Sequence, residues 1–250
     1  MFLVLKLTRG KGKNNKGEII TAVPVGTSFA LSDKLLFTAA HNVCNGKNDA
    51  LPEIGVVQVY EDPVLTSDIV VLTHEHHCSD KDEDWAVYKR SDGSFTHSVL
   101  ICPEHELPAA GIKIGIKDFP VGLISVGSVT KVTLDSFHTK VSKYQVFSDS
   151  AVPKKRKYSV VNSKPAPAVE QAIQVIGGRV TGSCGAAYFH VNGKVIAFHQ
   201  ESVDDGREEV STSNSRTSNR SHKSYSIGLV LCRLPKLCAW YNEKIPVNAI

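Results

Sequence analysis

Short apolar runs separated by turn-forming residues restrict the fold of this chain more than any other feature. Runs rich in valine, isoleucine, phenylalanine and threonine recur along the sequence, bounded by Gly, Asp, Ser and Pro. The strands that this pattern predicts are residues 19–25, 27–30, 34–38, 56–60, 68–73, 85–88, 112–116, 127–134, 172–176 and 194–199. Helical periodicity is nearly absent, and the one candidate helix is the apolar stretch 231–243. This frequency of short strands indicates a β-barrel or β-sandwich protein rather than alternating strands and helices.

The size and charge of the chain fit a globular protein that folds without metal ions or disulfide bonds. Its 250 residues, 42% of them hydrophobic, can bury a full core without metal or disulfide bonds. The formal net charge of +4 is concentrated in two basic runs, residues 6–16 and 154–157. Such runs can bind nucleic acid. Because no aromatic or helical recognition pattern accompanies them, we interpret them as a solvated tail and a solvated loop, and expect no nucleic-acid partner.

The cysteines and the first residues indicate a reducing compartment. The six cysteines form no close CxxC pair, so we expect neither a zinc site nor a redox motif. Residues 1–5 are apolar but too few for the core of a signal peptide, because Lys6 follows at once. No apolar run reaches the length that crosses a membrane. We therefore expect a cytoplasmic or otherwise intracellular protein with reduced thiols, no cofactor and no membrane partner.

Two segments are expected to lack regular structure. Residues 148–167 combine a basic run with three prolines, and residues 202–226 are dominated by Ser, Asn, Asp and Arg. The second segment is low in complexity and nearly free of apolar side chains, which predicts a long mobile loop between two strands.

Two short motifs and one aspartate carry residues suited to catalysis. The sequence TAAH, ending at His41, follows an apolar strand, and the sequence GSCG sets Cys184 between two glycines. Flanking glycines let the backbone turn sharply, so that the amides of Gly182 and Cys184 can both point at a reacting carbonyl oxygen. Asp84 opens another apolar strand between the two motifs.

In this order, the motifs resemble those of the chymotrypsin-like, or trypsin-like, peptidases, in which TAAH, an aspartate before a strand and GxSG follow one another. The resemblance extends over residues 26–234. It implies an all-β fold of two six-stranded antiparallel β-barrels with a C-terminal helix. The expected division is a basic tail at 1–17, a first barrel at 18–110 and a second barrel with the helix at 111–245.

The resemblance also implies a role for each residue. His41 would be the general base, Asp84 the acid that orients it, and Cys184 the nucleophile, with the amides of Gly182 and Cys184 as the oxyanion hole. A thiol attacks as thiolate, so an adjacent imidazole must take its proton. Cysteine replaces the usual serine here, as it does in picornaviral proteases of this fold. Asp68 also precedes an apolar strand and is the alternative acid.

Two further residues are candidates for substrate binding. His199 would lie on the strand that walls the specificity pocket, and Arg179 stands five residues before Cys184. Picornaviral proteases and staphylococcal glutamyl endopeptidase are similar in using a histidine here to bind a Gln or Glu side chain. Because arginine suits an acidic group, these residues predict an endopeptidase that cleaves polypeptides after Glu or Gln.

Two other functions stay open at this point. The cysteine nucleophile, the uncertain acid and the alanines Ala186 and Ala187 are also compatible with an inactive domain that only binds peptides or proteins. A nucleic-acid-binding module that uses the basic runs is the third alternative. The acidic residues Asp80, Asp82 and Glu83 before Asp84 are interpreted as part of a solvated loop.

Overall fold

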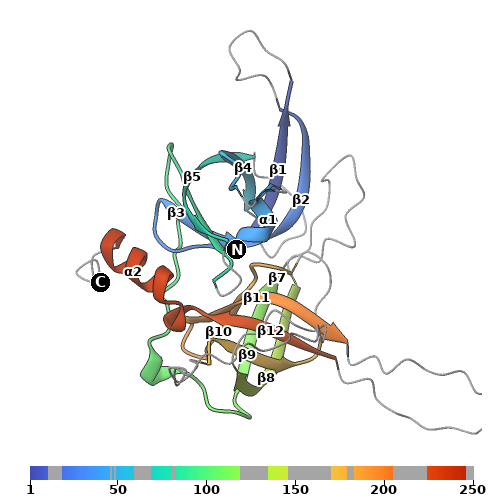
Figure 1. Cartoon of the computed structure of the whole chain (residues 1–250), viewed down its shortest axis with the longest axis vertical. Coiled ribbons are helices and arrows are strands. Elements are labelled where there is room, and N and C mark those ends of the chain that lie inside the picture. Colours follow the sequence, from blue (N-terminus) through green and yellow to red (C-terminus); the bar gives the residue numbers. More distant parts are fainter. Residues whose placement is uncertain are drawn as a thin grey trace, which may run out of the picture.

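Two closed antiparallel β-barrels of six strands each make up most of the molecule (Figure 1). The computed structural model describes residues 1–10, 19–45, 47, 49–58, 69–79, 83–118, 135–145, 170–178, 183–204 and 224–245. Within these ranges the strands dominate, and a short helix follows the last of them. The predicted all-β fold with two six-stranded barrels and a C-terminal helix is confirmed.

The first barrel is built from the N-terminal strands, in the order β1-β2-β3-β6-β5-β4. Its members are β1 (Phe2–Arg9), β2 (Ile19–Ala30), β3 (Leu35–Ala39), β4 (Glu53–Gln58), β5 (Val70–Cys78) and β6 (Trp85–Lys89). Pairing of β1 with β4 closes the ring. Side chains alternate across each strand, and the inward set includes Val4, Leu36, Ile54, Leu72 and Tyr88, all at most 1% exposed.

The second barrel follows in the order β10-β11-β12-β9-β8-β7. Its members are β7 (Lys113–Asp118), β8 (Asp135–Gln145), β9 (Ala172–Ile176), β10 (Ala187–Phe189), β11 (Val195–Asp204) and β12 (Ser224–Val230). Pairing of β7 with β10 closes the ring. Its core contains Ile116, Val175, Tyr188 and Ile196.

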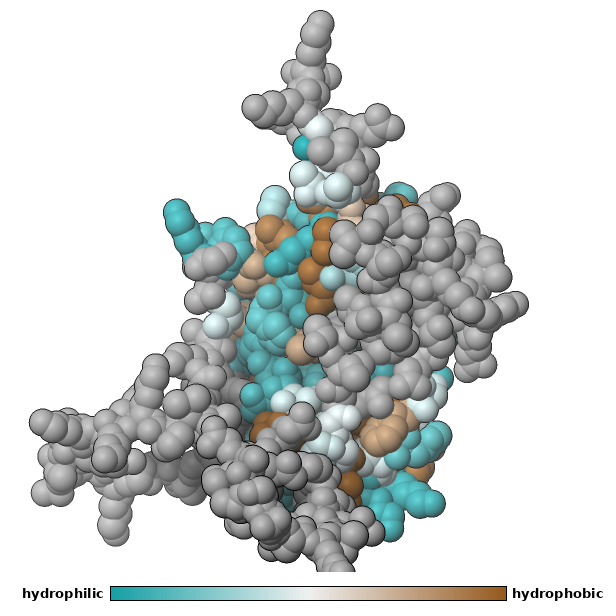
Figure 2. Space-filling view, turned by 90° about the vertical axis from the view of Figure 1, so that its right-hand side faces the viewer, coloured by the Kyte–Doolittle hydropathy of each residue, from teal (hydrophilic) through white to brown (hydrophobic). Residues whose placement is uncertain are grey.

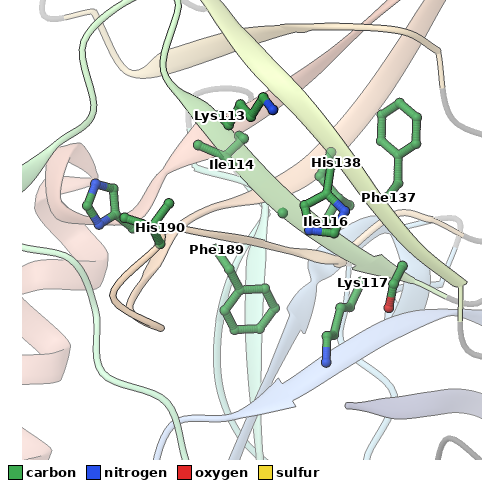
Figure 3. A pocket seen from close by; sticks show the side chains of 11 residues that line it. Lys113, Ile114, Ile116, Lys117, Phe137, His138, Phe189 and His190 are labelled. Atoms are coloured by element: carbon green, nitrogen blue, oxygen red, sulfur yellow. The ribbon is translucent and has the colours of Figure 1, made fainter.

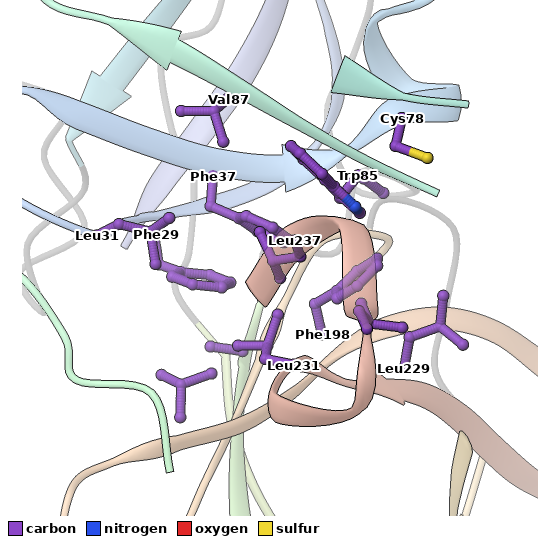
Figure 4. Packing of buried hydrophobic residues seen from close by; sticks show 14 of the residues in the cluster. Phe29, Leu31, Phe37, Cys78, Trp85, Val87, Phe198, Leu229, Leu231 and Leu237 are labelled. Carbon is purple, nitrogen blue, oxygen red and sulfur yellow. The ribbon is translucent and has the colours of Figure 1, made fainter. Parts of the chain in front are cut away.

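A third apolar cluster joins the two barrels (Figure 4). Phe37 of the first barrel and Phe198 of the second meet edge to face, with ring centroids 5.0 Å apart. The C-terminal segment forms a 3₁₀ turn at Leu231–Arg233 and then helix α2 at Pro235–Lys244. Leu237 of this helix packs into the same cluster. Burial of apolar surface from both barrels and the helix therefore fixes how the barrels sit together.

The structure differs from the sequence expectations at three places. The chain enters the first barrel at β1, where residues 2–5 are buried, whereas a tail was expected at 1–17. The expected loop 202–226 is shorter, because β11 runs to Asp204 and β12 starts at Ser224. The helix starts at Pro235, since proline is favoured at the first helical position.

Other expectations fall on parts of the chain that the structure does not describe. The strand at 127–134, the basic run at 154–157 and the whole of segment 148–167 lie outside the described residues. In the described part, no helix has the length and apolar character needed to cross a membrane. On the face shown in Figure 2, hydrophilic residues fill the centre of the described surface, and hydrophobic ones form small separate patches.

Candidate active site

His41 lies just after the end of β3, on the single helical turn α1 (Ala40–Val43). Its backbone N–H donates to Asp84 Oδ1 at 2.8 Å, and its ring Nδ1 hydrogen-bonds Asp84 Oδ2. The N–H of Ala40 donates to the carbonyl of Asp84 at 3.1 Å. Ala39 and Ala40 are fully buried, which explains the small residues before the histidine. The structure thus brings together two of the predicted triad residues.

Asp84 has a third partner that holds its carboxylate in place. The side-chain Nε2 of Gln200, on β11 of the second barrel, donates to Asp84 Oδ2 at 2.7 Å. Burial alone would raise the pKa of Asp84, but hydrogen bonds from His41 and Gln200 and the charge of His41 lower it below its usual value. The carboxylate is therefore ionised and can orient the imidazole.

Cys184 lies in a tight turn whose shape depends on glycine. Gly185 has φ of 84°, and a Cβ atom there would lie 2.2 Å from the carbonyl oxygen of Thr27, so no larger residue fits. The carbonyl of Cys184 accepts hydrogen bonds from the Thr27 N–H and from Asn42 Nδ2, both at 2.9 Å. Both donors belong to the first barrel. They hold the Cys184 turn against the barrel that carries His41.

Cys184 contributes to the electrostatic environment of His41. The thiol donates to the carbonyl of Gln200 at 3.5 Å, and its interaction with the imidazole is among the causes that raise the pKa of His41. Burial would lower the pKa of His41, but hydrogen bonds with Asp84 and Cys184, together with their charges, raise it to about 10. The His41 side chain is still 42% exposed, so a substrate can reach it. Asp84, His41 and Cys184 are therefore connected by hydrogen bonds, with Gln200 joining Cys184 to Asp84.

The predicted oxyanion hole is described in part. Gly182 lies outside the described residues. Among those described, none accepts a hydrogen bond from the amide of Cys184, which leaves this donor available for a substrate oxygen. The hydroxyl of Ser183 donates to Asp118 Oδ2, with both residues fully buried. The Ser183 hydroxyl is therefore engaged by Asp118 rather than by the imidazole of His41.

The candidate substrate residues are also described only in part. His199 is 2% exposed on β11, its Nδ1 lies 2.8 Å from the Tyr188 hydroxyl, and its Nε2 lies 3.3 Å from the Ser202 hydroxyl. Its carbonyl accepts the N–H of Gly185, the residue after Cys184. Arg179 and the alternative acid Asp68 lie outside the described residues.

Sequence reasoning missed two residues of this site. Asn42 follows His41 directly and reaches the carbonyl of Cys184, and Gln200 follows His199 and contacts both Asp84 and Cys184. Alternation along the strand 194–199, extended by one residue, puts position 200 on the opposite face from His199. That alternation is the signal that could have identified Gln200. For Asn42, only its place beside the histidine gave a hint.

The other thiols differ from Cys184 in their surroundings. All six cysteines are free. Burial, as the main cause, raises the pKa of Cys44, Cys78, Cys102 and Cys238, and raises that of Cys232 to about 12. These five groups are therefore protonated at neutral pH. Within the described ranges, no three His, Cys, Asp or Glu side chains are grouped so that they could hold a metal ion.

Comparisons with known proteins agree with the fold. No family model matches the chain, and no curated protein matches its sequence. Among solved structures, it is similar to an inactive serine-to-alanine mutant of Rv3671c from M. tuberculosis, with a TM-score of 0.53 and 12% identity over 98% of this chain and 88% of that one.

Two further structures of the same protein give similar values. The inactive form of the Rv3671c protease matches with a TM-score of 0.53 and 13% identity over 86% of this chain and 82% of that chain. The active form from M. tuberculosis matches with a TM-score of 0.52 and 11% identity over 95% and 79%. At this identity, the similarity shows the chymotrypsin-like two-barrel fold of the chain and leaves its chemistry to its own residues.

Proposed function

We propose that this protein is an endopeptidase that hydrolyses peptide bonds through Cys184, His41 and Asp84. One observation carries the proposal: the imidazole of His41 hydrogen-bonds the carboxylate of Asp84, and interactions with Asp84 and Cys184 together raise the pKa of His41. A base held between an ionised acid and a nucleophile is the arrangement that covalent catalysis of acyl transfer requires. The three similar structures are of a protease, which agrees with this reading.

The proposed reaction runs in two steps. The proton of Cys184 resides on His41, whose pKa of about 10 keeps the imidazole protonated at neutral pH, and the Cys184 thiolate adds to the scissile carbonyl carbon. The resulting oxyanion is stabilised by the amide of Cys184 and, by resemblance, that of Gly182. His41 then gives its proton to the amine as the C–N bond breaks. Water, deprotonated by His41, attacks the thioester, and the C–S bond breaks to release the acid and restore the thiol.

A peptide-library assay tests this proposal. The wild type should cleave library members, and Cys184→Ala should lose all cleavage, because the alanine side chain cannot form a thioester. Cys232→Ala is the matched control, since it removes another partly exposed thiol outside the proposed triad and should retain activity. If the wild type binds peptides but cleaves none, the protein is the inactive peptide-binding module instead.

We further propose that His199, with Arg179, selects Glu or Gln before the scissile bond. His199 is buried on the strand that carries Gln200, and its ring is fixed by Tyr188. A buried acidic or amide group left unpaired costs on the order of 1–3 kcal/mol. His199→Ala should therefore lower cleavage after Glu or Gln far more than cleavage after Leu.

The ratio of the two cleavage rates is the measurement, since a general loss of folded protein lowers both rates alike. Tyr188→Phe removes only the hydroxyl that fixes the His199 ring and should shift the ratio in the same direction by a smaller factor. A wild-type preference for aromatic or basic residues that His199→Ala leaves unchanged would refute the assignment of the pocket.

A further inference from the structure

The outer face of β7, β8 and β10 carries a pocket that has no part in the proposed catalysis (Figure 3). The pairing register puts Phe189 of β10 and His138 of β8 on either side of Gly115 in β7. Paired residues of antiparallel strands direct their side chains to the same face. The two side chains therefore leave the same face of the sheet on either side of the glycine, where His138 is exposed and Phe189 is partly buried against the apolar cluster that joins the barrels.

Gly115 leaves the floor of this pocket open. A Cβ atom at Gly115 would have no atom within 4 Å. Neighbouring strands lie about 4.8 Å apart, so Phe189 and His138 are separated by about 10 Å across two strand spacings. Because stacked rings have centroids about 4.5–7 Å apart, one flat ring placed over Gly115 can contact both residues. The pocket volume of about 230 Å³ suits a single ring system.

Positive charge lies at both ends of the pocket. Lys113 and Lys117 stand two positions before and after Gly115 on β7, on the same face as the pocket. Figure 3 shows their side chains at opposite ends of the site. Lys140, opposite Lys113 on β8, adds a third ammonium group. Among the described residues that line the pocket, none is acidic. The charge therefore favours an anionic ligand.

We propose that this face binds single-stranded nucleic acid, with one base over Gly115 between Phe189 and His138 and the backbone phosphates beside Lys113 and Lys117. Proteins that hold single strands combine aromatic stacking of bases with a basic groove for the backbone. A flat base flanked by phosphates matches a pair of rings flanked by ammonium groups. An acidic peptide would match the charge and leave the space between the rings unused.

The site is linked to the proposed active site through the end of β7. Lys117 precedes Asp118, whose carboxylate accepts the hydroxyl proton of Ser183, the residue before Cys184. Nothing in the proposed site depends on the basic runs at 6–16 and 154–157. A variant that alters only the pocket therefore distinguishes binding at the pocket from binding at the basic runs.

Fluorescence anisotropy with a labelled oligouridylate tests the proposal. Gly115→Val fills the floor and leaves every charge in place, and it should weaken binding roughly 5- to 150-fold, the loss expected for one stacked base. Changing Lys113 and Lys117 together to Gln should lower the slope of log K against log salt by about 1.4, at about 0.7 for each phosphate contact. Lys47→Gln, an exposed charge outside the lining residues, should change neither quantity.

Competitors identify the ligand. Unlabelled oligouridylate should displace the probe, and an oligoglutamate of equal charge should not. If uridine monophosphate displaces the probe from the wild type but not from Gly115→Val, the result also supports the site and shows that a free nucleotide is a sufficient ligand. Thermal melting of each variant verifies that it is folded. Equal binding by the wild type and a folded Gly115→Val variant, or equal displacement by oligoglutamate, would overturn the proposal.

Discussion

At the scale of single residues, Gln200 links the acid and the nucleophile of the proposed triad. Its Nε2 donates to Asp84 and its carbonyl accepts from the Cys184 thiol. Its side-chain oxygen is buried and, among the described residues, has no hydrogen-bond partner. An unpaired buried acceptor costs about 1–3 kcal/mol. The unpaired side-chain oxygen of Gln200 therefore lowers the stability of the fold, whereas its amide nitrogen orients the carboxylate of Asp84.

Replacing this amide should separate activity from stability. In Gln200→Leu, the carboxylate of Asp84 loses one donor, so kcat should fall, and the pKa of Asp84 should rise. Because the unpaired oxygen disappears as well, Tm should change little. Gln174→Leu on β9 is a matched control that should leave kcat unchanged. A large drop in Tm with kcat per folded molecule unaltered would show that Gln200 is only structural.

The ionisation of His41 offers a second test at this scale. Hydrogen bonds and charges of Asp84 and Cys184 raise its pKa from 6.5 to about 10. Cys184→Ala removes one of these partners, so NMR titration of the imidazole should show a lower pKa than in the wild type. Since the folded pKa lies above the unfolded one, this pairing stabilises the fold fully below pH 6.5 and is lost as pH rises through about 10. An unchanged pKa would mean that the thiol does not contact His41.

At the scale of elements, helix α2 depends on a carboxylate from the first barrel. The interpretation of Asp80, Asp82 and Glu83 as part of a solvated loop is wrong for Glu83, which is 2% exposed. Its carboxylate accepts the backbone N–H groups of Lys236 and Leu237, at 2.9 and 3.0 Å, and the indole N–H of Trp85 at 3.0 Å. Free N–H groups and the helix dipole make a helix start favourable for an anion. A ten-residue helix is marginal alone and needs such a contact.

Removing this carboxylate should destabilise the fold. Glu83→Ala leaves two buried N–H donors, of Leu237 and Trp85, and the part-buried one of Lys236 without their acceptor, and each unpaired buried group costs about 1–3 kcal/mol. Urea unfolding should therefore show a loss of several kcal/mol. Glu243→Ala, near the exposed end of the same helix, is the control and should shift the midpoint little. Equal midpoints for the two variants would contradict the assigned role of Glu83.

Sequence patterns predicted the strands with clear apolar runs better than the strands that carry many polar or basic residues. Runs such as 85–88 and 172–176 are mostly apolar, and the structure has strands there. Strand β8 was missed because its inward Phe137, Thr139 and Val141 alternate with Ser, His and Lys, so no apolar run marks it. The N-terminal strand β1 was interpreted as a tail because its basic residues dominated the pattern. The pairing of Gln200 with Asp84 joins two barrels, and no local pattern encodes such a contact.

At the scale of the whole molecule, the proposed site exists only where the barrels meet. The first barrel contributes His41 and Asp84, and the second contributes Cys184 and Gln200. The shared apolar cluster and the hydrogen bonds to the Cys184 carbonyl hold the two halves together. Reactivity of the thiol therefore depends on the assembled fold, since an imidazole from the other barrel must take its proton.

The rate of thiol alkylation, measured for each cysteine by mass spectrometry, tests the triad most directly. In the folded wild type at neutral pH, iodoacetamide should modify Cys184 far faster than the other five cysteines, whose pKa values are raised by burial. His41→Ala should slow modification of Cys184 by at least about tenfold, because the thiolate loses its imidazole partner. The His41→Ala substitution changes no side chain of the hydrophobic core, which includes Tyr88 and Trp85. If Cys184 is modified no faster than the other cysteines, or at the same rate with and without His41, the account of a catalytic triad is wrong.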